Sequence, residues 1–326
     1  MDVNSRNVSH RVEFMQIVRG VTKFGLPGLI FAIAVAAPAQ EAPTFSTRVN
    51  VVSLLATVRD REGRIISNLT PDDFVLMEDG VPQKIRYFSQ ESDLPLSIGL
   101  LVDTSRSQSC VLEEERGASY KFLDQVLREG KDQAFIAHFD TRVETLEALT
   151  SSRVKLASAL EELLIPEEVA TLLYSAVRDC AQNPMHSQTG RKALILLTDG
   201  VAFKDPVSID TAIEFAQRAD TIIYSIRFSD PVSIGPLRAA FVAGMKEHGK
   251  LELERMSKET GGVSYGVTKN RPIDAIYSEI EEALRNQYSI GYTPTRPSPD
   301  GKFHKVKLTT RDRHLVVTTR DGYYAK

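Results

Sequence analysis

Three oxygen-bearing side chains, Asp103, Ser105 and Ser107, occupy every second position of a short polar segment that directly follows an apolar run. At this spacing, one turn of the chain can direct all three oxygens towards a single point. Thr171 and Asp199, far away in the sequence, offer further oxygen atoms beside other apolar segments. Hard oxygen ligands suit Mg²⁺, Mn²⁺ or Ca²⁺ better than softer metals. These residues are therefore predicted to bind one divalent cation.

The elements that must position these residues follow from the pattern of apolar residues. The run Leu96–Val102 is almost continuously apolar, as expected of a strand buried on both faces of a sheet. Similar runs are found at 133–139, 193–198 and 221–227, and helical patterns separate them at 112–128, 153–164, 172–182 and 209–218. This alternation predicts an α/β fold with a doubly wound, mostly parallel, Rossmann-like sheet. In such sheets, ligands bind beyond the carboxyl ends of the strands, where Asp103 and Asp199 are both expected.

The predicted α/β domain covers residues 95–286, and its last part is less regular. Residues 231–250 are interpreted as an insertion, and a helix is expected at 251–259 because Gly261-Gly262 is typical of a helix C-cap. A final strand is expected at 263–267 and a final helix at 272–286.

Two flanking segments, 45–92 and 287–326, show short alternating strands and turns instead. In the first, Asp79-Gly80 is a strong signal for a hairpin turn. In the second, strands are expected at 288–292, 303–309 and 315–323. Each segment is too short to bury a core alone. The two are therefore predicted to pack together as one β module into which the α/β domain is inserted.

Residues 1–39 have the features of a secretory signal peptide. Basic residues precede an uncharged stretch from Phe24 to Ala37, and Ala37-Pro38-Ala39 supplies the small residues that predict cleavage after Ala39. An uncleaved membrane anchor is the second interpretation, but a spanning helix needs roughly 20 apolar residues, and this stretch is shorter and interrupted by Pro27. We therefore expect an exported protein, periplasmic or extracellular, with no membrane span in the mature chain.

Bulk composition narrows the range of partners. The formal net charge is -3, with acidic and basic residues mixed along the chain, so no basic patch argues for nucleic acid. The two cysteines, Cys110 and Cys180, are too few for a disulfide framework. Two buried free thiols are the simpler interpretation, although an oxidising compartment permits a bridge.

With these motifs the sequence resembles the von Willebrand factor A family. The resemblance covers Pro95 to Arg285 and includes an Asp-x-Ser-x-Ser loop, a distant Thr and a distant Asp in the family's order. The flanking segments, with Glu78-Asp79-Gly80 and Asp321-Gly322-Tyr323, resemble the bacterial VWFA-related exported proteins. The resemblance implies a metal ion-dependent adhesion site that holds a divalent cation, usually Mg²⁺, through the five residues named above. It also implies that one coordination position stays open for an Asp or Glu carboxylate of a partner protein.

We therefore expect a non-enzymatic, metal-dependent protein-binding module of the adhesion type. Two alternatives remain open: a metal-dependent phosphohydrolase with Asp103 as nucleophile, and a scaffold whose polar loop residues only cap helices and satisfy backbone groups. The segment Gly262–Gly266 fits the G-x-S-x-G hydrolase pattern, but a helix is expected before it and a strand after it, the reverse of a nucleophile elbow. Residues 244–251 nearly spell a phosphate-binding loop, but Leu251 replaces the Ser or Thr that binds magnesium. A turn between helices is expected there.

Overall fold

The computed structural model of the protein describes residues 51–90, 93–228, 236–296 and 300–325. The predicted signal peptide at 1–39, with its cleavage site and the alternative membrane anchor, lies outside the described residues. None of the described helices is both long enough and apolar enough to cross a membrane.

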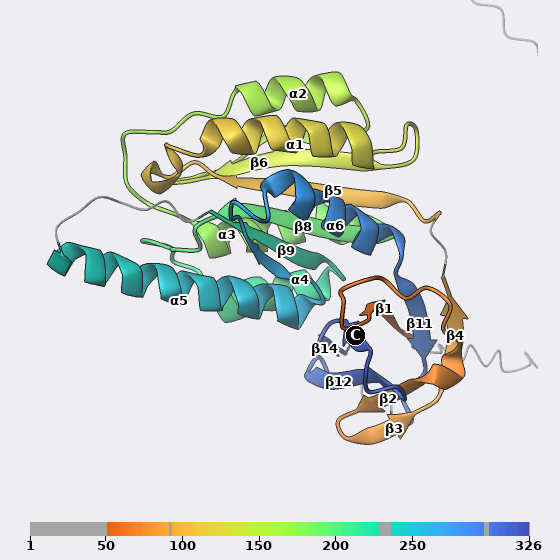
Figure 1. The fold of residues 1–326 in the computed structure, drawn as a ribbon. Helices are drawn as coiled ribbons and strands as arrows, with labels where there is room; N and C mark the ends of the chain where they lie inside the picture. The colour runs from red at the N-terminus through yellow and green to blue at the C-terminus, as the bar shows by residue number, and fades with distance from the viewer. Residues whose placement is uncertain (1–50, 91–92, 229–235, 297–299, 326) are drawn as a thin grey trace, which may run out of the picture. The chain divides into compact units, whose positions relative to one another are not determined.

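A six-stranded sheet forms the centre of the α/β part, with the strand order β10-β9-β8-β5-β6-β7 (Figure 1). Neighbouring strands are parallel except β6 and β7, which are antiparallel. The strands are β5 (Leu96–Asp103), β6 (Gln133–Phe139), β7 (Val143–Thr150), β8 (Arg191–Thr198), β9 (Ile222–Arg227) and β10 (Ser264–Gly266). Every residue of β5 and β8 is buried, as expected of central strands covered on both faces. The predicted doubly wound, mostly parallel sheet is confirmed.

Helices cover both faces of this sheet (Figure 1). One apolar core contains residues of α1 (Leu112–Val126), α2 (Arg153–Glu161) and α6 (Ile273–Arg285). The other contains residues of α3 (Leu173–Gln182), α4 (Ile209–Arg218) and α5 (Pro236–Thr260). Because successive side chains of a strand point to opposite faces, Leu100 belongs to the first core and Leu101 to the second.

Helix α5 differs from the prediction. It begins at Pro236 instead of 251, so it includes most of the segment interpreted as an insertion and all of the near phosphate-binding loop at 244–251. The expected turn between helices is therefore wrong, and residues 231–235 lie outside the described residues. Glycine misleads here because Gly249 serves packing: a Cβ added to it would lie 2.6 Å from the carbonyl carbon of Gly200. Because neither Gly249 nor Gly200 has a side chain, α5 can pass close to the loop after β8.

The flanking segments form two four-stranded antiparallel sheets, and each sheet combines strands from both segments. The orders are β13-β1-β11-β4 and β14-β12-β2-β3. The strands are β1 (Val52–Arg59), β2 (Phe74–Glu78), β3 (Val81–Gln83), β4 (Ile85–Ser89), β11 (Tyr288–Tyr292), β12 (Phe303–Thr310), β13 (Val316–Thr318) and β14 (Gly322–Tyr324). Asp79 and Gly80 have positive φ and join β2 to β3, as predicted for a two-residue turn. The single strand predicted at 315–323 is instead two strands, β13 and β14.

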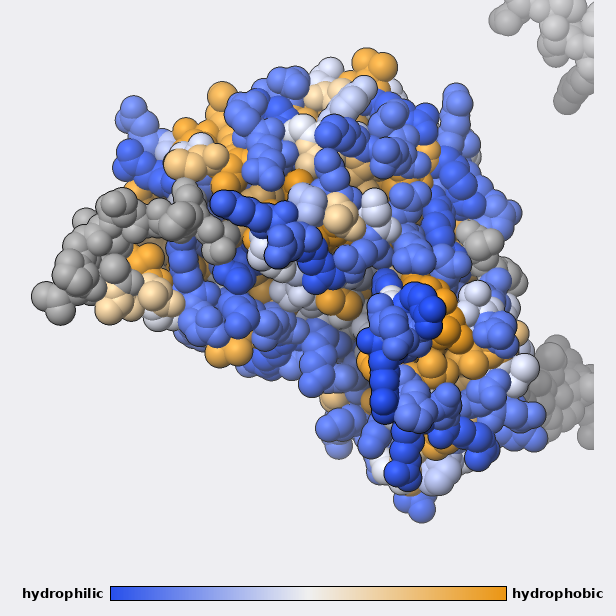
Figure 2. Space-filling model, viewed as in Figure 1, coloured by the Kyte–Doolittle hydropathy of each residue, from blue (hydrophilic) through white to orange (hydrophobic). Residues whose placement is uncertain are grey.

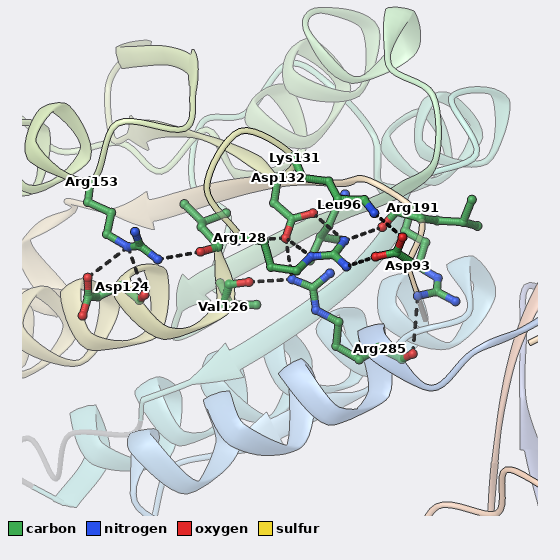
Figure 3. A network of polar contacts seen from close by, with 12 residues as sticks. Asp93, Leu96, Asp124, Val126, Arg128, Lys131, Asp132, Arg153, Arg191 and Arg285 are labelled. Atoms are coloured by element: carbon green, nitrogen blue, oxygen red, sulfur yellow. Dashed lines mark hydrogen bonds and ion pairs between the residues drawn. The ribbon is translucent and has the colours of Figure 1, made fainter. Parts of the chain in front are cut away.

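A buried carboxylate lies at the amino end of β5. The side chain of Asp132 has no exposed area. It accepts hydrogen bonds from the backbone N–H of Leu96 at 2.9 Å, from Arg128 Nε at 2.8 Å and from Arg285 Nη2 at 2.6 Å (Figure 3). Burial alone would raise the pKa of Asp132, but the hydrogen bonds of the two guanidinium groups outweigh it and hold the pKa well below its usual value. This network joins the start of β5 to the chain after α1 and to the end of α6.

The surface is mainly polar. Figure 2 shows a largely hydrophilic face on which apolar groups are interspersed in small patches. Both cysteines are free, but only Cys180 is buried, whereas Cys110 is exposed. The interpretation of two buried thiols is therefore wrong for Cys110, which lies in the loop before α1.

Candidate metal site

Three of the predicted ligands come together at the carboxyl end of β5. Asp103 is fully buried, and its Oδ1 accepts the backbone N–H of Ser105 at 2.8 Å. This bond folds the loop back over the end of the strand. The hydroxyl oxygens of Ser105 and Ser107 then lie 3.1 Å apart. Ser105 is buried and Ser107 is exposed, so this pair of oxygens extends from the interior to the solvent.

Asp199 reaches the same edge because β5 and β8 are parallel neighbours, with Val102 opposite Leu197. The hydroxyl of Thr198 donates to Asp103 Oδ2 at 2.6 Å and thereby links the two strand ends. Asp199 is buried, and its Oδ1 accepts the backbone N–H of Val201 at 3.0 Å. The aspartates at the ends of β5 and β8 are thus held by their own loops, next to each other.

Thr171, just before α3, is positioned by backbone contacts. Its N–H donates to the carbonyl of Phe203 at 2.9 Å, and its carbonyl accepts the N–H of Phe203 at 3.1 Å. The N–H of Leu172 donates to the carbonyl of Asp140 at 3.0 Å. Thr171 therefore lies between the loops that follow β6 and β8, and it is buried. Within the described residues its hydroxyl makes no hydrogen bond to the other four predicted ligands.

The electrostatics of this edge favour a cation. Burial, together with the negative charge of Asp199, raises the pKa of Asp103 to about 7, against the lowering effect of the Ser105 and Thr198 hydrogen bonds. Within the described part of the chain, neither aspartate forms an ion pair with a lysine, arginine or histidine. A divalent cation would turn the repulsion between the two carboxylates into attraction.

Two more polar side chains beside the loop are buried without hydrogen-bond partners. They are Gln108, through its Oε1, and Glu115, through both carboxylate oxygens. Unsatisfied buried acceptors are rare in native proteins and indicate an absent water or ion. Their oxygens, like the hydroxyl and carboxylate oxygens of the loops, are of the hard type that a divalent cation prefers.

Three supporting residues were not among the predicted ones. The hydroxyl of Thr104 donates to Asp140 Oδ2 at 2.7 Å and ties the loop after β5 to the loop after β6. Burial would raise the pKa of Asp140, but this bond and others outweigh it and lower the pKa. Asp205 Oδ2 accepts the N–H of Tyr174 at 2.7 Å and caps α3 directly after Thr171. Asp140 follows a buried strand, as Asp199 does, so the rule that found Asp199 could have found it.

A second group of possible ligands, Glu78, Asp79 and His304, lies in the β sheets. Its members already have protein partners. Glu78 Oε2 accepts the hydroxyl of Tyr292 at 2.6 Å, and Asp79 Oδ2 lies 2.8 Å from His304 Nδ1. The hydrogen bond to Asp79 raises the pKa of His304. These contacts explain the group as an ion pair and a tyrosine contact that close the β2–β3 hairpin against β12.

The family model of the von Willebrand factor type A domain matches residues 97–279 of the chain. No curated protein matches the chain. Several solved structures are similar. BatB from Bacteroides thetaiotaomicron is 17% identical, with a TM-score of 0.45, covering 59% of this chain and 100% of that chain.

Two further solved structures are of a byssus matrix protein and of a pilus tip protein. Proximal thread matrix protein 1 from the mussel byssus, solved with a zinc-occupied MIDAS motif, is 13% identical, with a TM-score of 0.49, covering 64% of this chain and 49% of that chain. The vWF domain of the type V pili tip protein Mfa5 from Porphyromonas gingivalis is 12% identical, with a TM-score of 0.45, covering 59% of this chain and 95% of that chain.

The matched residues begin in β5 and end in α6, so they take in the central sheet, the helices on both of its faces and the loops that carry the candidate ligands. This range is more than half of the chain. The chain therefore belongs to the von Willebrand factor type A domain family.

Proposed function

We propose that this protein is a metal-dependent protein-binding module whose divalent cation is held by Asp103, Ser105, Ser107, Thr171 and Asp199. Domains of this family are commonly metal-dependent protein-interaction modules and are typically not enzymes. The observation that carries the proposal is the pair of hydroxyls 3.1 Å apart above the fully buried Asp103. Mg²⁺ is the preferred cation, with Mn²⁺ and Ca²⁺ as alternatives, because all the donors are hard oxygens.

The proposed ligands would leave the cation able to bind a carboxylate of a partner protein. Both oxygens of Asp103 and one oxygen of Asp199 already accept hydrogen bonds from the protein. Three of the five proposed ligands are neutral hydroxyls, which leave the cation more electrophilic than an all-carboxylate set would. When bound, the cation would act as a Lewis acid for an Asp or Glu side chain of another protein. The exposed Ser107 marks the side from which that side chain would enter.

An exported protein fits this function. The sequence features of residues 1–39 predict a signal peptide, and adhesion-type binding takes place outside the cytoplasm. We therefore propose a periplasmic or extracellular location.

Two enzymatic interpretations, a phosphohydrolase with Asp103 as nucleophile and a G-x-S-x-G hydrolase, are less well supported. Asp103 as a nucleophile would need a free carboxylate oxygen facing solvent, but its side chain is fully buried and both oxygens accept hydrogen bonds. In the G-x-S-x-G segment, α5 ends at Thr260 and β10 begins at Ser264. This helix–strand order is the reverse of a nucleophile elbow.

Metal binding is tested first, by titrating Mg²⁺ and Mn²⁺ into the purified mature chain in a calorimeter. Ser105→Ala should weaken the affinity by at least about tenfold, since loss of even an outer-shell partner typically costs about 10- to 100-fold. Ser109→Ala is the matched control, because Ser109 is exposed in the same loop. Wild-type protein that takes up neither metal, with no change in melting temperature, would refute the proposal in favour of a scaffold.

Partner binding is tested by pull-down from an envelope extract, with Mg²⁺ or with chelator. A partner should be retained by wild type and Ser109→Ala with Mg²⁺, and lost with chelator or with Ser105→Ala. Replacing acidic residues of the captured protein one by one should identify a single carboxylate whose loss abolishes capture. Capture that is indifferent to metal and to Ser105→Ala would contradict carboxylate binding through the cation.

A further inference from the structure

Glu115 is a buried acid that the five proposed ligands leave unexplained. It lies in the first turn of α1, directly after the loop that carries Ser105 and Ser107, and none of its surface is exposed. Its neighbours Glu113 and Glu114 are exposed. Neither carboxylate oxygen of Glu115 has a hydrogen-bond partner among the described residues. Burying an unpaired carboxylate is costly, so such a group either takes up a proton or meets a positive charge from outside the chain.

The environment of Glu115 is acidic on the side of the candidate metal site. Burial raises its pKa well above the usual value, and the negative charges of Asp103, Glu114 and Asp199 add to the increase. Asp103 ends β5, and α1 begins at Leu112 in the connection that follows it, so the first turn of α1 is the continuation of the loop that carries the candidate ligands. Gln108, which is 1% exposed and has an unpartnered Oε1, lies in the connecting loop. Its Nε2 donates to Ser107 Oγ at 3.4 Å.

A purely structural role does not account for Glu115. The hydroxyl of Tyr277 on α6, whose buried side chain interacts with α1, is 2.9 Å from Ser119 Oγ and makes no hydrogen bond to Glu115. Structural carboxylates in this chain look different: Asp132 has two arginine partners. Glu115 therefore has the burial of a structural acid without the partners of one.

We propose that Glu115 is a sixth, positioning residue of the metal site, which accepts hydrogen bonds from the hydration shell of the divalent cation. This inference rests on the proposed metal-binding function. Outer-shell carboxylates orient the groups around a metal and tighten its binding. In this role Glu115 would strengthen the hold on the cation without occupying a coordination position, so the position proposed for a partner carboxylate stays open.

The test compares Glu115→Gln, which removes the charge and keeps the shape, with Glu114→Gln, which removes the same charge from an exposed position of the same turn. Mg²⁺ affinity is measured by calorimetry, and melting temperature is measured with chelator and with Mg²⁺. We expect Glu115→Gln to weaken Mg²⁺ binding by about 10- to 100-fold, and Glu114→Gln to stay within about twofold of wild type. In chelator, Glu115→Gln should melt at the same temperature as wild type or higher, because among the described residues the buried side chain has no hydrogen-bond partner to lose and its charge has no counter-charge.

The outcomes separate this inference from the proposed function. If Glu115→Gln binds Mg²⁺ as tightly as wild type does, the role of Glu115 is overturned and the five-residue site stays intact. If wild type binds no metal, both the role of Glu115 and the proposed function are overturned. A lower melting temperature of Glu115→Gln in chelator would give Glu115 a structural role and also overturn the inference. Glu115→Asp, which keeps the charge on a shorter side chain, should recover part of the Mg²⁺ affinity lost in Glu115→Gln if the carboxylate itself is required.

Discussion

Asp132→Asn is the perturbation whose effect the structure defines best. The change keeps the size of the side chain but removes its charge. Asp132 accepts hydrogen bonds from Arg128 at 2.8 Å and from Arg285 at 2.6 Å, and it is completely buried. The Arg128 and Arg285 side chains are 33% and 17% exposed, so after the change water can solvate them only in part. The mutant therefore leaves two guanidinium groups near the interior without their counter-charge.

The magnitude follows from these contacts. Hydrogen bonds to charged groups contribute about 1.5–3 kcal/mol each, and loss of one partner of a buried ion pair costs about 3–5 kcal/mol. Partial hydration of Arg128 places the expected loss at the lower end, about 3 kcal/mol at pH 7. For a unit of this size, that loss lowers the melting temperature by roughly 5–10 °C. The asparagine oxygen can still accept the backbone N–H of Leu96, so the fold should persist.

The effect should depend on pH with a definite sign. Because the folded-state pKa of Asp132 is depressed, its contribution is fully present above the unfolded-state pKa, about 3.9, and is lost as the pH falls towards the folded-state pKa. At pH 3 the difference between wild type and Asp132→Asn should shrink by about 1.2 kcal/mol, since one pKa unit corresponds to about 1.36 kcal/mol.

Urea denaturation of both proteins at pH 7 and pH 3, in chelator, measures these differences. A difference below about 1 kcal/mol at pH 7, or one that does not decrease at pH 3, would refute the reasoning. Mg²⁺ affinity should be unchanged in Asp132→Asn, because Asp132 lies at the amino end of β5 and the candidate site at its carboxyl end. A large loss of metal affinity would mean that the two ends of the sheet are coupled.

Three further changes test individual contacts. Thr198→Val removes the 2.6 Å hydrogen bond to Asp103, so it should destabilise the protein by about 1–3 kcal/mol and weaken Mg²⁺ binding. Wild-type Mg²⁺ affinity in calorimetry would exclude a positioning role for Thr198. Asp205→Ala removes the cap of α3 and should lower the free energy of unfolding in urea by about 1–2 kcal/mol. An unchanged urea midpoint would show that the cap is dispensable. Gly262→Ala would place a Cβ 2.0 Å from a backbone oxygen of β9 and should lower the melting temperature strongly, whereas Ser264→Ala should stay near wild type. Equal melting temperatures of the two variants would show that the packing against β9 does not require a glycine.

Most of the fold could be predicted because local patterns and tertiary structure agree. The buried strands stand out as apolar runs, and Asp79-Gly80 has the positive φ angles that its residue types favour. Prediction fails where the role of a residue depends on a distant partner. Gly249 looks like a loop signal in the sequence, yet it lies inside α5 and packs against Gly200. The short strands β13 and β14 each pair with a different sheet, which no local pattern reveals.

The candidate site divides in the same way. Asp103, Ser105 and Ser107 could be predicted to come together because they are near in sequence, and the structure places their loop over the end of β5. Asp199 could be predicted because ligands of parallel sheets bind beyond the carboxyl ends of the strands, and Asp199 directly follows one of these strands. Glu115 could not be selected, because it stands in a run of three glutamates and only its burial distinguishes it from its neighbours. That Glu115 is buried without a hydrogen-bond partner among the described residues depends on how α1 packs in the folded protein, which the sequence does not show.

The two ends of the central sheet treat buried acids in opposite ways, and this contrast is the physical argument for a cation. At the amino end, Asp132 is matched by two arginines from this chain. At the carboxyl end, Asp103, Asp199 and Glu115 are all buried, and no lysine, arginine or histidine forms an ion pair with them in the described part of the chain. Without such partners, these acids must be compensated by protons or by a positive charge from outside the chain, and the proposed cation would supply that charge. Such a cation would stabilise the folded state by about 2.7 kcal/mol at a concentration 100 times its Kd, so the melting temperature should rise with Mg²⁺ concentration.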